Sequence, residues 1–294
     1  MKSSPVTHML RVLRGRLRSD RPLREAARRA DAFLVSYPKS GRTWLRYLLS
    51  CYFVEVGRLG FQPDLTSMFR ILPNFDRDPV RGIGAFVGRS ARLPFVLVSH
   101  LAYRQALFRD RPVVFLVRDP RDVIVSAYFH ATRHKGLFAG DITAFLDAPK
   151  YGVPSLVQFL NGWAQGLDGR PHLLVSYEHL LAQPHAVVDT ILRFLQVEID
   201  PAALSRAIDA ARFDQMRSLE RSQGIPGHAY DRKDDQSLRM RSGKAKAFSD
   251  WLDADDAAAI LARCQAELTP AARRLLALTG VDLDADRQPA AARG

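Results

Sequence analysis

Short apolar runs alternate with longer segments of helical periodicity along most of this chain. Residues 32–36, 95–99, 113–117 and 172–176 are runs of four or five mostly apolar residues. Continuous apolar runs are typical of strands that are covered on both faces, and strands that alternate with helices form parallel sheets. The pattern therefore predicts an α/β fold, a single domain with a central parallel sheet flanked by helices.

Helical periodicity predicts helices between and after these strands, and three other segments are expected to be loops. The helices are expected at residues 43–56, 101–108, 121–133, 155–167, 185–195, 201–211, 254–266 and 270–278. The expected loops, at residues 57–94, 134–154 and 213–248, are rich in Pro, Gly or charge, and such long loops usually serve binding. We divide the chain into a basic lead-in (1–30), one domain (31–281) and a disordered tail (282–294).

The charge balance points to anionic ligands. The chain carries 43 Lys and Arg against 31 Asp and Glu, a net charge of +12, and most of the basic residues are arginines, which bind phosphate and sulfate well. The basic lead-in is a candidate for peripheral contact with a membrane surface. No apolar run reaches about 18 residues, and Cys51 and Cys264 lie in apolar contexts that favour free thiols. We expect a cytoplasmic protein without a membrane span.

The segment from Ala32 to Val56 carries the strongest chemical prediction. An apolar strand leads into a tight polar loop, Tyr37-Pro-Lys-Ser-Gly-Arg-Thr-Trp44, and a helix follows. Amide groups and the helix dipole make a positive site at such a junction, and Lys39 and Arg42 add full charges. The loop departs twice from the nucleoside-triphosphate pattern G-x-x-x-x-G-K-[ST], because Ser36 stands at its first glycine and Arg42 at its lysine.

The loop instead resembles the 5′-phosphosulfate loop of sulfotransferases that use 3′-phosphoadenosine 5′-phosphosulfate (PAPS). The usual form in that family is Pro-Lys-Ser-Gly-Thr-Thr-Trp, so Arg42 is the one departure in this stretch. The resemblance implies a P-loop-like 5′-phosphosulfate loop in which six consecutive residues contact the donor. These are Lys39, Ser40, Gly41, Arg42, Thr43 and Trp44.

A second strand–loop–helix follows in Val113-Val-Phe-Leu-Val-Arg-Asp-Pro-Arg-Asp-Val-Ile-Val-Ser126. The family holds the 3′-phosphate with an arginine after this strand and a serine eight residues later, and Arg118 and Ser126 have that spacing. An apolar strand followed by an acid also resembles a magnesium-binding strand of a triphosphatase. Arg118 argues against that reading, because a cation beside Asp119 disfavours Mg²⁺ there, and we expect no metal.

Further positions match the family along the rest of the chain. Residues 238–251 are similar to the late motif Arg-Lys-Gly-x-x-Gly-Asp-Trp, which closes over the 3′-phosphate; Arg241 and Gly243 are kept, and Ser242 replaces Lys. Tyr177 and Phe213 match aromatic residues that contact adenine in the family, and with Trp44 they would clamp a purine ring.

His100 ends the second strand, at the position of the family's general base, although Val98 and Ser99 replace the Lys-Thr that commonly precedes it. An imidazole near its ordinary pKa suits removal of a hydroxyl proton. Asp64 or Asp76, in the loop 57–94, is the alternative base.

The resemblance implies sulfuryl transfer from PAPS to an acceptor hydroxyl by in-line attack, with 3′-phosphoadenosine 5′-phosphate (PAP) as the product. It gives catalytic roles to His100 as base, to Lys39 at the leaving oxygen and to Ser126. Two other classes stay open, a nucleoside-triphosphate kinase and a non-enzymatic basic module that binds nucleic acid or membrane. The expected acceptor is a small-molecule, lipid-like or carbohydrate hydroxyl, with no specific nucleic-acid partner.

Overall fold

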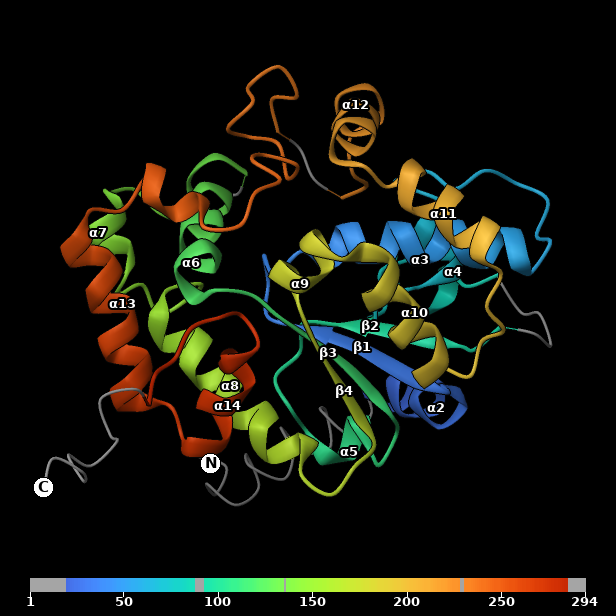
Figure 1. The fold of residues 1–294 in the computed structure, drawn as a ribbon, viewed down its shortest axis with the longest axis horizontal. Helices are drawn as coiled ribbons and strands as arrows, with labels where there is room; N and C mark the ends of the chain where they lie inside the picture. Colours follow the sequence, from blue (N-terminus) through green and yellow to red (C-terminus); the bar gives the residue numbers. More distant parts are fainter. Residues whose placement is uncertain (1–19, 88–92, 135, 228–229, 285–294) are drawn as a thin grey trace, which may run out of the picture.

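Four parallel strands form the centre of the fold (Figure 1). The computed structural model describes residues 20–87, 93–134, 136–227 and 230–284. The strands are β1 (Ala32–Ser36), β2 (Val96–Ser99), β3 (Val113–Val117) and β4 (His172–Ser176), in the order β2-β1-β3-β4. All three pairs are parallel. The predicted α/β class and central parallel sheet are therefore confirmed.

The sheet is apolar because both of its faces are covered by helices. On one face, Phe33 and Phe115 pack with side chains of α8 (Val153–Leu167), among them Trp163. On the other face, Leu34 and Val114 pack with α3 (Arg42–Val56), α10 (Pro184–Phe194) and α11 (Pro201–Ala210). Figure 1 shows these helices on opposite sides of the strands. Burial on both faces explains why the strands read as continuous apolar runs.

The helices differ from the sequence-based expectation in several places. The expected loops contain α4 (Met68–Ile71), α7 (Ile142–Phe145) and α12 (Phe213–Gln223), and the expected helix at 101–108 is reduced to α5 (Gln105–Phe108). The polar α12 is the largest correction; it buries two side chains, Met216 and Glu220. The remaining helices are α2 (Arg21–Arg29), α6 (Pro120–Phe129), α9 (Tyr177–Ala182), α13 (Ala254–Glu267) and α14 (Pro270–Ala277).

The ends of the chain are described in part. Within the basic lead-in expected at 1–30, α2 buries Ala26 and Ala27 in the core, whereas residues 1–19, the candidate membrane contact, lie outside the described residues. The expected tail also lies mostly outside them, from residue 285 onward. None of the helices in the described ranges combines the length and apolarity that a bilayer crossing needs.

The carboxyl ends of the strands bring the predicted site residues together. Val35 is in register with Ser99 on one side and with Phe115 on the other, so the strands end at the same edge of the sheet. His100 directly follows β2, Arg118 follows β3 and Tyr177 follows β4. Ligands of parallel sheets bind beyond this edge.

Candidate active site

A cavity of about 330 Å³ opens at the carboxyl edge of the sheet. It is lined by every predicted site residue except Ser40, namely Lys39, Gly41, Arg42, Thr43, Trp44, His100, Arg118, Ser126, Tyr177, Phe213, Arg241, Ser242 and Gly243. Ser40 is buried beside the cavity, at 2% exposure. Several lining residues were not predicted, among them Arg46, Asn74, Arg81 and Arg239.

The β1–α3 loop has the backbone of an anion-binding turn. Lys39 (φ +75°) and Gly41 (φ +92°) are both left-handed, and α3 begins at Arg42. The first amides of a helix have no acceptor within the helix, so they are available to an anion in the cavity. A Cβ atom on Gly41 would lie 2.4 Å from Cδ2 of Tyr177, so glycine is required here by backbone and neighbour alike.

Lys39 lies among other cations. Burial, followed by the charge of Arg239, lowers the pKa of Lys39 to about 7. Burial, followed by the charge of Arg46, also lowers the pKa of Arg42 well below its ordinary value. An anion in the cavity would offset the repulsion between these cations and raise the pKa of Lys39 again.

Arg118 links the second motif to the first. One of its terminal nitrogens (Nη1) donates to the Lys39 carbonyl oxygen over 3.3 Å, and its guanidinium lies 4.2 Å from the centre of the Tyr177 ring. Its Nε is buried, and no atom in the described part of the chain forms a hydrogen bond with it. An unpaired buried donor of a cation is costly, and a ligand phosphate would satisfy it.

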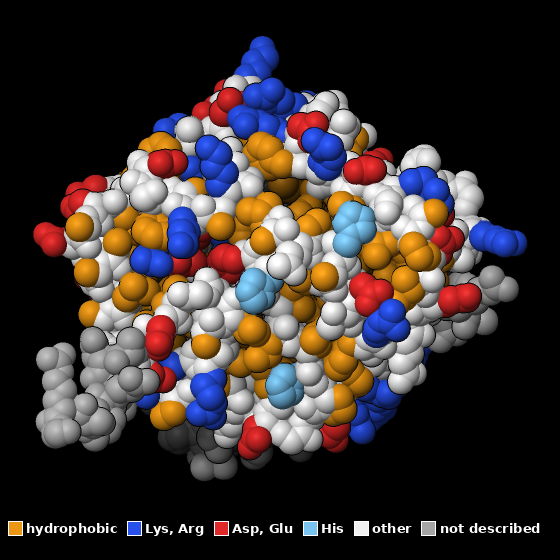
Figure 2. All heavy atoms as spheres, in the orientation of Figure 1, with side chains coloured by type: hydrophobic (Ala, Val, Ile, Leu, Met, Phe, Trp, Pro, Cys, Tyr) orange, Lys and Arg blue, Asp and Glu red, His pale blue; other side chains and the backbone are white. Residues whose placement is uncertain are grey.

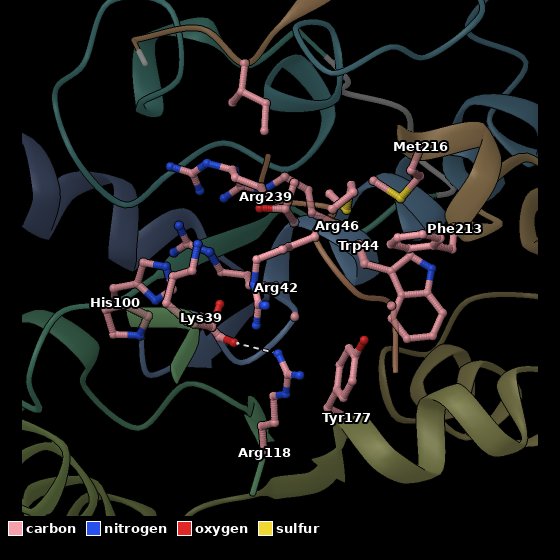
Figure 3. A pocket seen from close by; sticks show the side chains of 18 of the residues that line it. Lys39, Arg42, Trp44, Arg46, His100, Arg118, Tyr177, Phe213, Met216 and Arg239 are labelled. Carbon is pink, nitrogen blue, oxygen red and sulfur yellow. Dashed lines mark hydrogen bonds between the residues drawn. The ribbon is translucent and has the colours of Figure 1, made fainter. Parts of the chain in front are cut away.

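Three aromatic side chains gather at one end of the cavity (Figure 3). The rings of Trp44 and Tyr177 meet edge to face with centroids 5.7 Å apart, and the Trp44 indole donates to the Ala211 carbonyl oxygen over 2.8 Å. Phe213, the first residue of α12, faces Gly243 so closely that a Cβ there would lie 2.3 Å from its ring. A planar ring such as adenine fits between such faces.

The late loop is tied to α6 by a single carboxylate. Asp122 is 2% exposed and accepts hydrogen bonds from the amides of Lys246 (2.9 Å) and Phe248 (2.8 Å). The guanidinium of Arg241 lies over the rings of Phe129 (4.5 Å) and Trp251 (5.5 Å) while it lines the cavity. These contacts bring the partially matching late motif to the cavity that holds Arg118.

His100 lies at the other end of the cavity from the aromatic group, with Lys39 and Arg42 between them in Figure 3. Its Nδ1 is 2.7 Å from the Ser36 carbonyl oxygen, which can only accept. The Nδ1 atom therefore carries the hydrogen, and the neutral ring keeps its free lone pair on Nε2. Burial first, and then the charge of Arg42, hold the pKa of His100 well below 6.5.

The two acidic residues considered as alternative bases separate in the structure. Asp76 lines the cavity; burial lowers the pKa of Arg46 to about 9, and the charge of Asp76 opposes that shift. Asp64 does not line it; its carboxylate accepts from the amides of Thr66 and Ser67 at the start of α4. Among the described residues, no group of three or more His, Cys, Asp or Glu side chains is arranged to hold a metal ion.

Comparison with known proteins places the chain in a family. The sulfotransferase domain family matches residues 29–272. The 3-alpha-hydroxysteroid sulfotransferase of Cavia porcellus is 28% identical over 213 residues, which are 68% of this chain and 71% of that protein. Sulfotransferase 2A1 of Homo sapiens is 26% identical over 213 residues, 65% of this chain and 68% of that protein.

Two solved structures share the fold. Mouse sulfotransferase SULT7A1 complexed with PAP has a TM-score of 0.57 at 20% identity and covers 84% of this chain and 88% of its own. Retinol dehydratase in a complex with retinol and PAP has a TM-score of 0.60 at 20% identity, with 82% and 81% covered. The match over residues 29–272 agrees with the motifs, and the chain belongs to the family of PAPS-dependent sulfotransferases.

Proposed function

We propose that the cavity binds PAPS along the carboxyl edge of the sheet and that the protein transfers its sulfuryl group to an acceptor hydroxyl. We place PAPS in this way because of one observation. The aromatic residues, the Lys39 loop and His100 lie in this order along one cavity. The adenine would lie with Trp44, Tyr177 and Phe213. Gly41 and Gly243 allow the backbone to pack directly against the rings of Tyr177 and Phe213, which holds these rings at the cavity.

Arg118, Ser126 and Arg241 would hold the 3′-phosphate, with Ser242 and Gly243 closing over it. The orphaned Nε of Arg118 supports this placement, because a phosphate oxygen would give it a partner. Arg42 and Thr43, at the helix start, would hold the 5′-phosphate with the loop residues Ser40 and Gly41. When bound, the donor supplies the sulfuryl group and a good leaving group, the 5′-phosphate of PAP.

His100 would take the acceptor proton on Nε2, because its Nδ1 is occupied by the Ser36 carbonyl. The acceptor oxygen forms its bond to sulfur as the bond between sulfur and the bridging oxygen breaks, and that electron pair stays on the 5′-phosphate. Lys39 would stabilise the charge that develops on this oxygen, with Ser126 nearby. Asp76 is the alternative base, since it lines the same cavity.

The acceptor is a small molecule with a hydroxyl group in this proposal. One named relative is a 3-alpha-hydroxysteroid sulfotransferase, and a lipid-like or carbohydrate hydroxyl is an acceptor of the same chemical class. Peripheral membrane contact through the basic lead-in and a cytoplasmic location remain predictions. Cys51 and Cys264 are free thiols, which supports the prediction of a cytoplasmic location, because the cytoplasm is a reducing compartment.

Ligand competition tests the function. PAP, adenosine 5′-monophosphate (AMP) and ATP with Mg²⁺ are compared by calorimetry and by thermal shift. We expect PAP to bind most tightly, because the two phosphates meet separate cationic groups. Tighter binding of Mg²⁺–ATP than of PAP would favour a kinase, and equal weak binding of all three would favour a non-enzymatic basic surface. Transfer from PAPS to an added alcohol, detected as a sulfate mass gain, completes the test.

A further inference from the structure

The cavity wall near His100 is rich in arginine. Arg46 and Arg239 line it beside Arg42, and Asp76 is the carboxylate that faces them. In Figure 3, Arg46 and Arg239 lie on the side of Arg42 away from Arg118. A pocket that binds a neutral alcohol needs no such charges. The arginines therefore indicate the charge of the acceptor.

Arg46 is the most buried of these arginines. It lies one turn after Arg42 in α3 and is 2% exposed. One terminal nitrogen (Nη2) donates to the Asn74 side-chain oxygen over 2.6 Å, and the guanidinium lies 4.5 Å from the centre of the Phe69 ring. Its Nε is buried and finds no hydrogen-bond partner among the residues that the structure describes. A buried guanidinium held in place with an unused donor is prepared for a ligand oxygen.

Arg239 is held at the same wall by a buried carboxylate. Glu220 of α12 is fully buried and accepts from the amides of Arg239 (2.8 Å) and Met240 (2.9 Å), and the Tyr230 hydroxyl donates to it over 2.6 Å. These three hydrogen bonds fix the backbone that carries Arg239. Around this part of the face, basic side chains gather over α12 and the segment that follows it (Figure 2).

These arginines lie near the proposed base rather than near the 3′-phosphate position. The charges of Arg42, Arg46 and Arg239 all act to lower the pKa of His100. Arg118 and Arg241, the cations proposed for the 3′-phosphate, act on the pKa of Lys39, and Arg239 acts on it as well. Arg46 and Arg239 line the same cavity as His100 and lie on the side of Arg42 away from Arg118, so we place the acceptor beside them.

We propose that the acceptor carries an anionic group, a carboxylate or a phosphate, which Arg46 and Arg239 bind while its hydroxyl lies at Nε2 of His100. The inference rests on the proposed function and names its substrate class. Phe69, Ile225 and Met240 also line the cavity, so an apolar segment joins the two polar ends of the acceptor. Arginine suits both anions, because its planar fork binds either of them with two hydrogen bonds.

Matched alcohols test the charge requirement. The probes are 6-hydroxyhexanoate, 6-hydroxyhexyl phosphate and the neutral 6-hydroxyhexanamide. Their binding to the enzyme–PAP complex is measured by calorimetry and their turnover with saturating PAPS by mass spectrometry. We expect at least one of the two anionic probes to exceed the amide by about 10-fold or more in affinity and in kcat/KM, the value of a charge-assisted hydrogen bond. The preferred anion distinguishes carboxylate from phosphate.

Variants of Arg46 and Arg239 test whether these two arginines cause the preference for anionic acceptors. Arg46→Gln keeps much of the side-chain volume and a donor for Asn74, and we expect it to reduce the preference for an anionic probe over the amide by about 10-fold or more. Arg239→Gln should act in the same direction. Arg206→Gln is the control, because Arg206 is exposed and pairs with Glu55 outside the cavity.

Each result has one meaning. A wild-type enzyme that binds and converts the amide as well as both anions overturns the proposal, even if the variants fail to fold. A loss in Arg46→Gln that is equal for all three probes, with a raised KM for PAPS, assigns the arginines to the donor and also overturns it. Failure of wild-type protein to bind PAP, measured first and without acceptor, contradicts the proposed function instead.

Discussion

The carboxylate of Asp122, in the first turn of α6, lies 3.2 Å from the guanidinium of Arg118, which precedes that helix, and the same carboxylate holds the late loop. One buried group therefore connects the residue after β3 with a segment more than 100 residues later in the chain. The connection is a long-range contact that joins two motifs, and it makes the 3′-phosphate end of the cavity depend on a residue that no motif identified.

Asp122→Ala should destabilise the protein and loosen the late loop. Removing one partner of a buried ion pair costs about 3–5 kcal/mol, because the other charge stays buried without compensation. The free energy of unfolding is measured by urea denaturation, and PAP affinity by calorimetry. Asp189→Ala is the control, since Asp189 pairs with Arg193 on an exposed helix surface, where such pairs contribute about 0–1 kcal/mol. Equal losses in the two variants would contradict the linking role.

Arg118→Ala and Ser126→Ala should each weaken PAP binding far more than AMP binding. Each removes one hydrogen bond to a charged acceptor, worth about 1.5–3 kcal/mol, and AMP lacks the 3′-phosphate that would receive it. Calorimetry with both ligands measures the difference. Arg121→Ala is the matched control, because Arg121 pairs with Asp119 on the same helix and does not line the cavity. Equal losses for PAP and AMP would place the 3′-phosphate elsewhere.

Gly243→Ala should reduce PAP affinity beyond its effect on stability. Gly243 has φ +63°, and its added Cβ would lie 2.3 Å from the Phe213 ring at the adenine end. Gly169 is a close control, with φ +69° and nothing within 4 Å of the added atom. Both variants should lose about 1–2 kcal/mol of stability from backbone strain, whereas only Gly243→Ala should lose nucleotide affinity. Unchanged PAP binding in Gly243→Ala would separate this loop from the nucleotide.

PAP binding should be accompanied by proton uptake at pH 8. The pKa of Lys39 is about 7 in the free protein, so most of these amines are neutral at pH 8, and the phosphates would raise that pKa on binding. PAP itself contributes little, because its phosphates have a second pKa near 6 and are already ionised. The affinity should therefore fall as pH rises above about 7.

Calorimetry at pH 8 in phosphate and in Tris buffers counts the protons, since the two buffers have different ionisation enthalpies. We expect uptake approaching one proton in the wild type and little in Lys39→Met. The variant should also lose more turnover than PAP affinity, because the charge of Lys39 acts most strongly on the leaving oxygen. Uptake that persists in Lys39→Met would assign the proton to another group.

The apolar patterns and short motifs of the sequence predicted the strands and the residues that follow them. Side-chain contacts between distant segments, in contrast, could not be predicted from these local patterns. Strands 32–36, 113–117 and 172–176 match the structure. The first two are buried along their whole length, whereas the edge strand 172–176 is buried only at its carboxyl end. The helix α12 was missed because few of its residues are apolar, and its position depends on buried Glu220. Arg46 was missed for a similar reason: it lies within a predicted helix, and only the fold shows that it faces the cavity.

His100→Ala should remove most of the transfer activity while PAP affinity stays close to that of the wild type. A general base acts on the acceptor and contributes about 10²–10⁴ in rate, whereas His100 lies away from the aromatic end of the cavity. Asp76→Asn is the comparison, because Asp76 is the acidic alternative in the same cavity. A larger loss in Asp76→Asn than in His100→Ala would assign the base to the aspartate.

The pH profile gives the decisive evidence on the base. The neutral ring of His100 is the active form, so activity rises with pH through its pKa and is level above it. An unperturbed histidine would place that rise near pH 6.5, but burial and the neighbouring arginines hold the pKa of His100 well below this value in the free enzyme. The bound donor brings negative charge beside Arg42, which opposes the arginines and raises the pKa again.

Two profiles therefore separate the free and donor-bound forms. In kcat/KM for PAPS, the rise should lie well below pH 6.5; in kcat/KM for the acceptor at saturating PAPS, it should lie at higher pH. An arginine variant extends the test, because the charge of Arg46 also lowers the pKa of His100. Arg46→Gln should shift both rises toward higher pH, whereas a base that does not feel this charge would keep its profile unchanged. Rises that stay in place in Arg46→Gln, or that persist in His100→Ala, would show that His100 is not the group that accepts the proton.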